Sequence, residues 1–454
     1  MSDTSVEPAT GSHPSSTSRL AAGMFVVLAS VAAANLPVTI ILARSLDPAG
    51  YGELQFLNRL AFIAISVAQL GLPHALSWAM TNARTLDERR TVYRFSCWTS
   101  VTAGIVVMGV ALIVAALGAQ PAPLLVWGLI AVYPMVNLLA AAIAGAARGL
   151  LDIRAVAAIR ISHAICWLGA AVILFVVDRI TLLTAVVALV GSQAVGALVA
   201  LGVAARCGAF RRRMGATRRD HGSIWKFARR VFLGHTIWSW NLYLDQVVLG
   251  FLVPASQLGI YAVAAGLTLA LNVLSMPIGA TAQPVVQRAR EDDRAKIVCG
   301  MLAMTIVLVG TAATALALLA PILVPPVLGM AYLPAIPLIQ ILCVAVVFDG
   351  INSCLHGVLL GLNAPKASSR NAMLGLLGNI VGWFLLLPTY GILGAALTSV
   401  AAYGMVTVSM LISVRRRLPG VTWSGFCTGV AREVPRAPRR VAALRSRTPE
   451  RLDA

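Results

Sequence analysis

The chain has 454 residues, of which 59% are hydrophobic and only 12% are charged, and its mean hydropathy is +0.84. A soluble protein of this length needs far more polar surface, so the composition excludes a soluble fold. Apolar runs of about 18 residues or more recur along the chain, and each is long enough to cross the hydrocarbon core as a helix. The sequence therefore predicts an all-α integral membrane protein.

The net charge of +19 would favour nucleic-acid binding if the chain were soluble. In a membrane protein the basic residues gather in cytoplasmic loops instead, so we expect no nucleic-acid partner. The seven cysteines form no CxxC pair, and most lie within apolar runs, where cysteine behaves as a small hydrophobe. We therefore expect no disulfide, no bound metal and no cofactor.

Taken in order, the chain divides into two halves between two polar tails. Residues 1–19 are rich in Ser, Thr, Pro and Gly, which is typical of a disordered tail. About twelve spans follow, and the halves 20–205 and 227–414 hold six each. The predicted spans are 20–43, 54–80, 92–117, 122–147, 155–177, 180–205, 227–253, 257–284, 297–320, 334–362, 371–388 and 391–414.

Two basic segments flank the second half. The linker 206–226 is most simply interpreted as a topology anchor at anionic headgroups, and a regulatory or partner-binding role is the alternative. The tail 415–454 is rich in Arg and Pro and lacks an apolar run, so we expect it to be cytoplasmic and to lie outside the bilayer.

The distribution of basic residues predicts the orientation. With a cytoplasmic N-terminus, all but three of the 36 Lys and Arg residues fall on or near the inner side, and the exceptions are Arg44, Arg59 and Arg179. One missed span would invert every later loop, so this bias supports the twelve-span map. Both termini are predicted to be cytoplasmic. Both halves then begin inside, which predicts a parallel repeat with its axis along the membrane normal.

A recurring turn supports the repeat. In residues 41–71 an apolar run ends at Pro48-Ala49 and a second run follows, and in residues 244–266 the same happens at Pro254-Ala255, with the register shifted by one residue. In transporters built from repeats, substrate binds at the interface between them.

Three stretches resemble the Wzx-type polysaccharide flippases, which belong to a superfamily that also holds multidrug extruders and lipid II flippases. They are ILARSLDPAGYGELQF with LGLPHAL, YLDQVVLGFLVPASQLGIYAVA, and LLPTYGILGAALTSVAAYG. The resemblance implies two parallel six-helix lobes around a central cavity that opens alternately to either side of a bacterial cytoplasmic membrane. It further implies an isoprenoid-pyrophosphate-linked oligosaccharide as cargo, as in O-antigen or exopolysaccharide synthesis, with polysaccharide polymerase and glycosyltransferases as partners.

Arg59, about five residues inside the second span, is the main candidate for binding this cargo. A guanidinium grips a pyrophosphate with paired hydrogen bonds, and Asn58 and Gln55 extend a polar face beside it. The alternative is that Arg59 only snorkels to the outer headgroups. Asp245, at a similar depth in the other half, is a second candidate, either as a cavity carboxylate that pairs with a cation, a proton or Arg59, or as part of a structural ion pair.

A polar stripe in the tenth span completes the candidate set. Asp349, Asn352 and His356 share one face of a helix, and charged groups within spans are costly unless they have a function or a partner. For His356 alone, an interhelical hydrogen bond is the simpler interpretation.

Three other classes of protein are alternatives that the sequence favours less. A cation-coupled multidrug antiporter of the same fold usually carries carboxylates in its N-terminal lobe, where this chain shows no clear mid-membrane Asp or Glu. A membrane-bound polymerase or ligase needs an external platform, and the outer loops are short. A major-facilitator transporter would carry a glycine-led DRxGR-like turn, which the loop 81–94 lacks.

Overall fold

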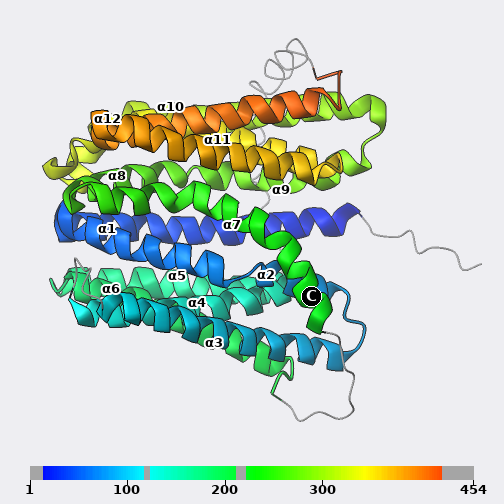
Figure 1. The fold of residues 1–454 in the computed structure, drawn as a ribbon, viewed down its shortest axis with the longest axis horizontal. Helices are drawn as coiled ribbons and strands as arrows, with labels where there is room; N and C mark the ends of the chain where they lie inside the picture. The colour runs from blue at the N-terminus through cyan, green and yellow to red at the C-terminus, as the bar shows by residue number, and fades with distance from the viewer. Residues whose placement is uncertain (1–13, 117–122, 211–220, 422–454) are drawn as a thin grey trace, which may run out of the picture.

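The computed structural model describes residues 14–116, 123–210 and 221–421. The described residues form helices and no strand, and the helices lie side by side with roughly parallel axes (Figure 1). The all-α prediction is confirmed. The first half contains α1 Pro14–Ala68, α2 Leu72–Thr81, α3 Leu86–Ala116, α4 Leu124–Gly149, α5 Ile153–Val176 and α6 Leu182–Arg206.

The second half follows the same order of long and broken helices. Its elements are α7 His221–Leu252, α8 Ala255–Leu269, α9 Asn272–Arg288, α10 Glu291–Leu328, the 3₁₀ turn η1 Met330–Tyr332, α11 Ala335–Gly361 and α12 Pro365–Arg415. In Figure 1 the second half lies above the first, and α1 and α7 run between them.

Each of the twelve predicted spans corresponds to a helix, a helix half or a broken pair. Eight described helices are long and apolar enough to cross a membrane, and the pair α8 and α9, bent by 49°, makes a ninth. The ribbons of α1 and α12 turn back at Asp47 and Gly391, where φ is 58° and 55°, so each of them holds two predicted spans (Figure 1). The remaining span is α7, whose strongly apolar part is confined to Tyr243–Leu252.

The predicted boundaries differ from the structure in several places, and α7, for example, already begins at His221 within the expected linker 206–226. Helix α1 already begins at Pro14, so residues 14–19 of the expected tail are helical. The predicted span 54–80 is broken, because Leu70 and Gly71 have positive φ and a new helix begins at Leu72. The parts of the tails and linker at 1–13, 211–220 and 422–454 lie outside the described residues.

The first turn is built by its own sequence. Asp47 Oδ1 accepts hydrogen bonds from the backbone N–H groups of Ala49, at 2.9 Å, and Gly50, at 3.1 Å. An aspartate in this position caps the N–H groups that the new helix leaves unpaired, and the proline after it needs no such partner. The predicted turn at Asp47–Gly50 is therefore confirmed with a local cause.

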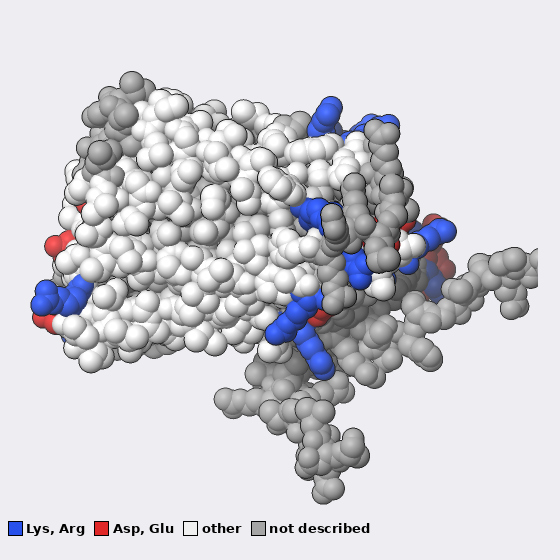
Figure 2. All heavy atoms as spheres, turned by 90° about the horizontal axis from the view of Figure 1, so that it is seen from below, with Lys and Arg blue, Asp and Glu red and all other residues white. Residues whose placement is uncertain are grey.

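Charge divides the molecule into three zones. Figure 2 shows a broad uncharged middle, with most Lys and Arg side chains gathered at one end. This charge-rich end holds the α2–α3, α4–α5 and α9–α10 connections and the end of α12, whereas the turns at Asp47, Asp178, Pro254 and Gly391 mark the charge-poor end. Large apolar side chains of α5, such as Ile165, Ile173 and Val176, are exposed on the middle zone. This pattern is that of a multi-pass membrane protein.

The two halves form lobes that share a core only towards the charge-poor end. There one apolar cluster joins residues of both halves, including the fully buried Tyr51, Tyr261 and Tyr332. Towards the charge-rich end the cluster splits into two. One contains first-half residues together with Ile224 and Ala228 at the start of α7, and the other contains second-half residues alone. The halves therefore share one core at the charge-poor end, whereas at the charge-rich end the start of α7 packs with the first half and the other second-half residues form a cluster of their own.

Candidate functional site

The second half of α1 lies against α7 and forms a long contact between the lobes. Near the charge-poor end the rings of Phe56 and Phe251 meet edge to face, with 5.1 Å between centroids. About two helical turns deeper, Phe62 packs on Tyr243 with 4.5 Å between ring centroids. These are tightly packed apolar contacts, so a polar residue between them lies in an enclosed part of the lobe interface.

Arg59 occupies that place. Its Nε donates a hydrogen bond to Gln246 Oε1 at 2.9 Å, and its guanidinium carbon lies 4.5 Å from the centroid of the Tyr243 ring. Both partners belong to α7, so Arg59 links the two lobes through neutral groups. Among the described residues, neither Nη atom of Arg59 has a hydrogen-bond partner and no carboxylate lies within ion-pair distance. A cation held in this way keeps most of its capacity to bind an anion.

Asp245 does not pair directly with Arg59. Its Oδ2 accepts a hydrogen bond from the Tyr261 hydroxyl at 2.6 Å, and its Oδ1 accepts one from the backbone N–H of Gln246 at 2.7 Å. Successive residues on a helix point about 100° apart, so Gln246 faces α1 while Asp245 faces α8. The direct pair, one of the interpretations open from the sequence, is absent among the described residues, and the two charges interact only over a longer distance.

The two amides predicted beside Arg59 behave differently. Gln55 Nε2 donates a hydrogen bond to the Tyr51 hydroxyl at 2.8 Å, whereas Gln55 Oε1 is buried and has no partner in the described part of the chain. Asn58 is partly buried, and no hydrogen bond to a described residue is found for its side chain. Polar capacity therefore remains unused on both sides of Arg59.

The polar stripe of α11 makes interhelical hydrogen bonds. Asp349 Oδ2 accepts one from Asn272 Nδ2 of α9 at 2.9 Å. Asn352 donates to the Tyr403 carbonyl at 3.1 Å and accepts from Thr407 Oγ1 at 2.8 Å, which joins α11 to α12.

The third member of the stripe also bonds to α12, because His356 Nδ1 shares a short hydrogen bond with Ser368 Oγ. These partners account for Asn352 and His356 by packing. Asp349 and Asp245 both lie near the side chain of Tyr403 of α12.

Three residues that contact Arg59 or Asp245 are not among the predicted site residues. Tyr243 and Gln246 on α7 hold Arg59, and Tyr261 on α8 holds Asp245. The sequence does carry a signal for two of them, since Tyr243, Asp245 and Gln246 stand together in an otherwise apolar run. Tyr261 has no such signal, because a lone tyrosine in an apolar helix is ordinary core.

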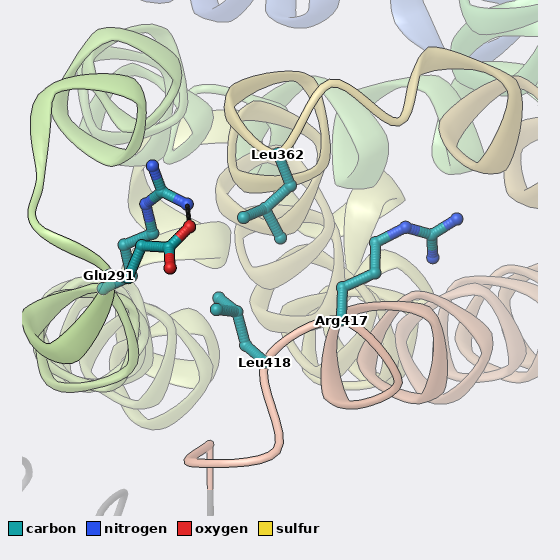
Figure 3. Close-up of a pocket in the computed structure, with 5 residues that line it drawn as sticks. Glu291, Leu362, Arg417 and Leu418 are labelled. Atoms are coloured by element: carbon teal, nitrogen blue, oxygen red, sulfur yellow. Dashed lines mark ion pairs between the residues drawn. The ribbon is translucent and has the colours of Figure 1, made fainter.

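A separate pocket of about 470 Å³ lies at the charge-rich end, between the start of α10 and the ends of α11 and α12 (Figure 3). Glu291 and Arg294 pair across 3.6 Å on its one side, Leu362 and Leu418 fill its middle, and the guanidinium of Arg417 points away from that pair. No residue predicted as a site lines this pocket, and it is far along the bundle from the turn before Arg59.

Comparison with known proteins places this geometry in a family. The family model described as "Polysaccharide biosynthesis protein" matches residues 20–290, which is more than half of the chain. The chain belongs to the polysaccharide biosynthesis protein family. This family lies within the MOP superfamily, which confirms the resemblance drawn from the three sequence stretches.

Solved structures show the same fold. An inward-facing multidrug resistance MATE family transporter of the MOP superfamily is similar with a TM-score of 0.70, 14% identity, and coverage of 94% of this chain and all of the other. The lipid II flippase MurJ in an inward closed conformation gives a TM-score of 0.67 and 13% identity over 92% of each chain. The fold prediction, two lobes of transmembrane helices in this superfamily's arrangement, is thereby confirmed.

One sequence relative matches only a short segment of the chain. An uncharacterized membrane protein of Methanocaldococcus jannaschii, MJ1068, is 39% identical over 72 residues. The match spans 16% of this chain and 14% of that protein. It therefore agrees with a membrane protein and says nothing about cargo.

Proposed function

We propose that the protein is a flippase that moves isoprenoid-pyrophosphate-linked oligosaccharide units across a bacterial cytoplasmic membrane by alternating access between its two lobes. Family membership supports a role in polysaccharide synthesis. The observation that carries the proposal is Arg59, a cation between the lobes that is held by Gln246 and Tyr243 and by no carboxylate within the described residues.

The chemistry of the cargo matches this arrangement. A pyrophosphate presents several oxygens that a guanidinium binds with two parallel hydrogen bonds, and such charge-assisted bonds are about twice as strong as neutral ones. The pyrophosphate therefore displaces a neutral amide acceptor such as Gln246 more readily than it would displace a carboxylate. The unused oxygen of Gln55 and the side chain of Asn58 lie on the same helix as Arg59 and would form hydrogen bonds with hydroxyl groups of the sugar. The prenyl chain stays in lipid.

Translocation makes and breaks no covalent bond, so the proposal assigns no catalytic residue and the protein acts as a transporter. Glycosyltransferases on the cytoplasmic side would supply the lipid-linked unit, and a polymerase on the outer side would consume it. The positive-inside pattern identifies the charge-rich end, with both termini, as the cytoplasmic side in this proposal.

The test is export by position-59 variants in cells at matched protein levels. Arg59→Ala is expected to abolish glycan export and leave lipid-linked oligosaccharide on the inner side of the membrane. Arg59→Lys is expected to keep part of the activity, because the charge remains while the planar fork is lost. Arg179→Ala, which removes an exposed arginine at the same end, is the matched control and should export normally. Near-normal export by Arg59→Ala would contradict the assignment and leave Arg59 as an anchor.

A cation-coupled antiporter of small molecules is the second candidate. The observation in its favour is that Asp245 and Asp349 are partnered by Tyr261 and Asn272, which are neutral, so each carboxylate is suited to take up a cation or a proton. Both carboxylates lie in the second lobe. Drug efflux that follows an imposed sodium or proton gradient and is lost in Asp245→Asn, with no glycan translocation, would favour this candidate over the flippase.

A further inference from the structure

The two sequence-related turns meet each other at the charge-poor end. A Cβ added to Gly52 would lie 1.8 Å from the carbonyl oxygen of Ala255, and one added to Gly259 would lie 1.9 Å from the carbonyl oxygen of Pro48. Real Cβ atoms do not approach other atoms so closely. The contact is therefore backbone against backbone, and only glycine permits it at either position.

This contact is reciprocal. Gly52 and Gly259 are 207 residues apart, and so are Pro48 and Ala255, so the two residues of each pair occupy equivalent positions in the repeat. Gly52 contacts Ala255, and Gly259 contacts Pro48, which is the equivalent contact. Such mutual contact is what a two-fold axis produces when two copies of one surface meet. The internal axis of the repeat therefore passes between Gly52 and Gly259, and the two turns form one self-complementary seam between the lobes.

Within each lobe, by contrast, a second set of glycine contacts fixes the short helix that continues the span after the turn, α2 in the first lobe and α9 in the second. In the first lobe the Cβ positions of Gly145 and Gly149 fall 2.5 Å and 2.3 Å from carbonyl oxygens of α2. In the second lobe Gly357 and Gly361 face α9 in the same way, at 2.2 Å and 2.9 Å. Both pairs have the small-xxx-small spacing that brings helices into close contact. The helices after each turn thus belong firmly to their own lobes.

The seam also lies where one apolar cluster joins both lobes, whereas at the other end the two lobes form different clusters and meet through the start of α7. We propose that the backbone contact between Gly52 and Gly259 is the closing contact of the charge-poor end of the transport path, and that it must separate each time the path opens there. Opening would also part α7 from α1 and so release the hydrogen bond between Arg59 and Gln246. This inference concerns the path and does not depend on the identity of the cargo.

The test measures access to a buried position one turn below the seam. Ala262 lies three residues after Gly259 on α8 and is 2% exposed, so a cysteine placed there in a background without native cysteines reports opening. The probe is a membrane-impermeant thiol reagent applied from the charge-poor side of purified protein in oriented proteoliposomes.

Gly52→Ala and Gly259→Ala should each label faster than the parent. One misplaced methyl group destabilises the closed seam relative to the open one. We expect the open population to increase by about 5- to 150-fold. Gly50→Ala is the matched control in the same turn, because its Cβ would be 3.4 Å from Leu46, an ordinary contact, and it should label at the parent rate.

Gly357→Ala separates gating from general loss of packing. Its Cβ would also clash with a backbone oxygen, that of Gly279 at 2.2 Å, but the contact lies within one lobe, so the substitution should lower thermal stability without increasing labelling at position 262. Unchanged labelling in Gly52→Ala and Gly259→Ala, in protein that elutes as a folded species, would overturn the proposal. Equal labelling of Gly357→Ala and Gly52→Ala would overturn it as well.

Discussion

The hydrogen bond between Tyr261 and Asp245 gives a prediction whose size follows from its geometry. We take the acceptor to be the ionised carboxylate, to which the hydroxyl donates a charge-assisted hydrogen bond of 2.6 Å. Hydrogen bonds to charged groups contribute about 1.5–3 kcal/mol, against about 1 kcal/mol for neutral ones. Tyr261 is fully buried, and Tyr261→Phe leaves the carboxylate, among the described residues, with the backbone N–H of Gln246 as its donor from another residue.

We therefore expect Tyr261→Phe to lower the free energy of unfolding by about 1.5–3 kcal/mol. In an Asp245→Asn background the same change should cost only about 1 kcal/mol, because the amide oxygen still accepts the hydroxyl but carries no charge. The assay is equilibrium unfolding, carried out in mixed micelles. It compares the parent protein, the two single variants and the double variant. The double-mutant cycle should show coupling of about 0.5–2 kcal/mol.

Additive effects in this cycle would refute the reasoning, because they would mean that the Asp245 charge is not stabilised by Tyr261. Ser256→Ala provides a control, since Ser256 is an exposed residue on the same helix and no hydrogen bond of its side chain to a described residue is found. Its effect on the free energy of unfolding should be within about 0.5 kcal/mol.

Two further predictions concern topology and the C-terminal segment. Reporter fusions should place residues 1, 215 and 454 in the cytoplasm and residues 48, 120 and 328 outside, because nearly all Lys and Arg lie on one side. An external signal at residue 215 would contradict both the twelve-span map and the parallel repeat. Removing residues 425–454 while Arg415, Arg416 and Arg417 remain should preserve orientation and transport, since the removed segment has no apolar run; lost transport at normal protein levels would show that the tail takes part.

The sequence predicts the fold well because membrane spans are marked by composition and length. The turn at Asp47 is also readable, since a capping aspartate, a proline and a glycine stand together. The break at Leu70 and Gly71 is less so, because its signals, Gly71 and Pro73, also occur inside continuous membrane spans. At this break Gly71 packs against the Ala228 carbonyl of α7, which would be 2.6 Å from a Cβ added to Gly71. This contact is tertiary, so the local sequence does not reveal it.

The candidate site shows the same limit. Arg59 and Asp245 are conspicuous as charges in apolar runs, but their partners depend on which way α7 is rotated. Gln246 bonds to Arg59 and Tyr261 bonds to Asp245, so a pairing that looks natural in sequence is replaced by two neutral ones. The repeat was visible at Pro48 and Pro254, whereas the spacing of 207 residues emerges only from the glycine contact.

Reconstituted translocation tests the central claim most directly. Purified protein in proteoliposomes is given a lipid-linked oligosaccharide with a pyrophosphate linkage, and the fraction that reaches the opposite leaflet is measured with an enzyme that cleaves only exposed glycan. We expect the parent protein to move this lipid, Arg59→Ala to move none above protein-free vesicles, and Arg179→Ala to match the parent. Movement by Arg59→Ala at the parent rate, or none by the folded parent protein under any imposed ion gradient, would contradict the account.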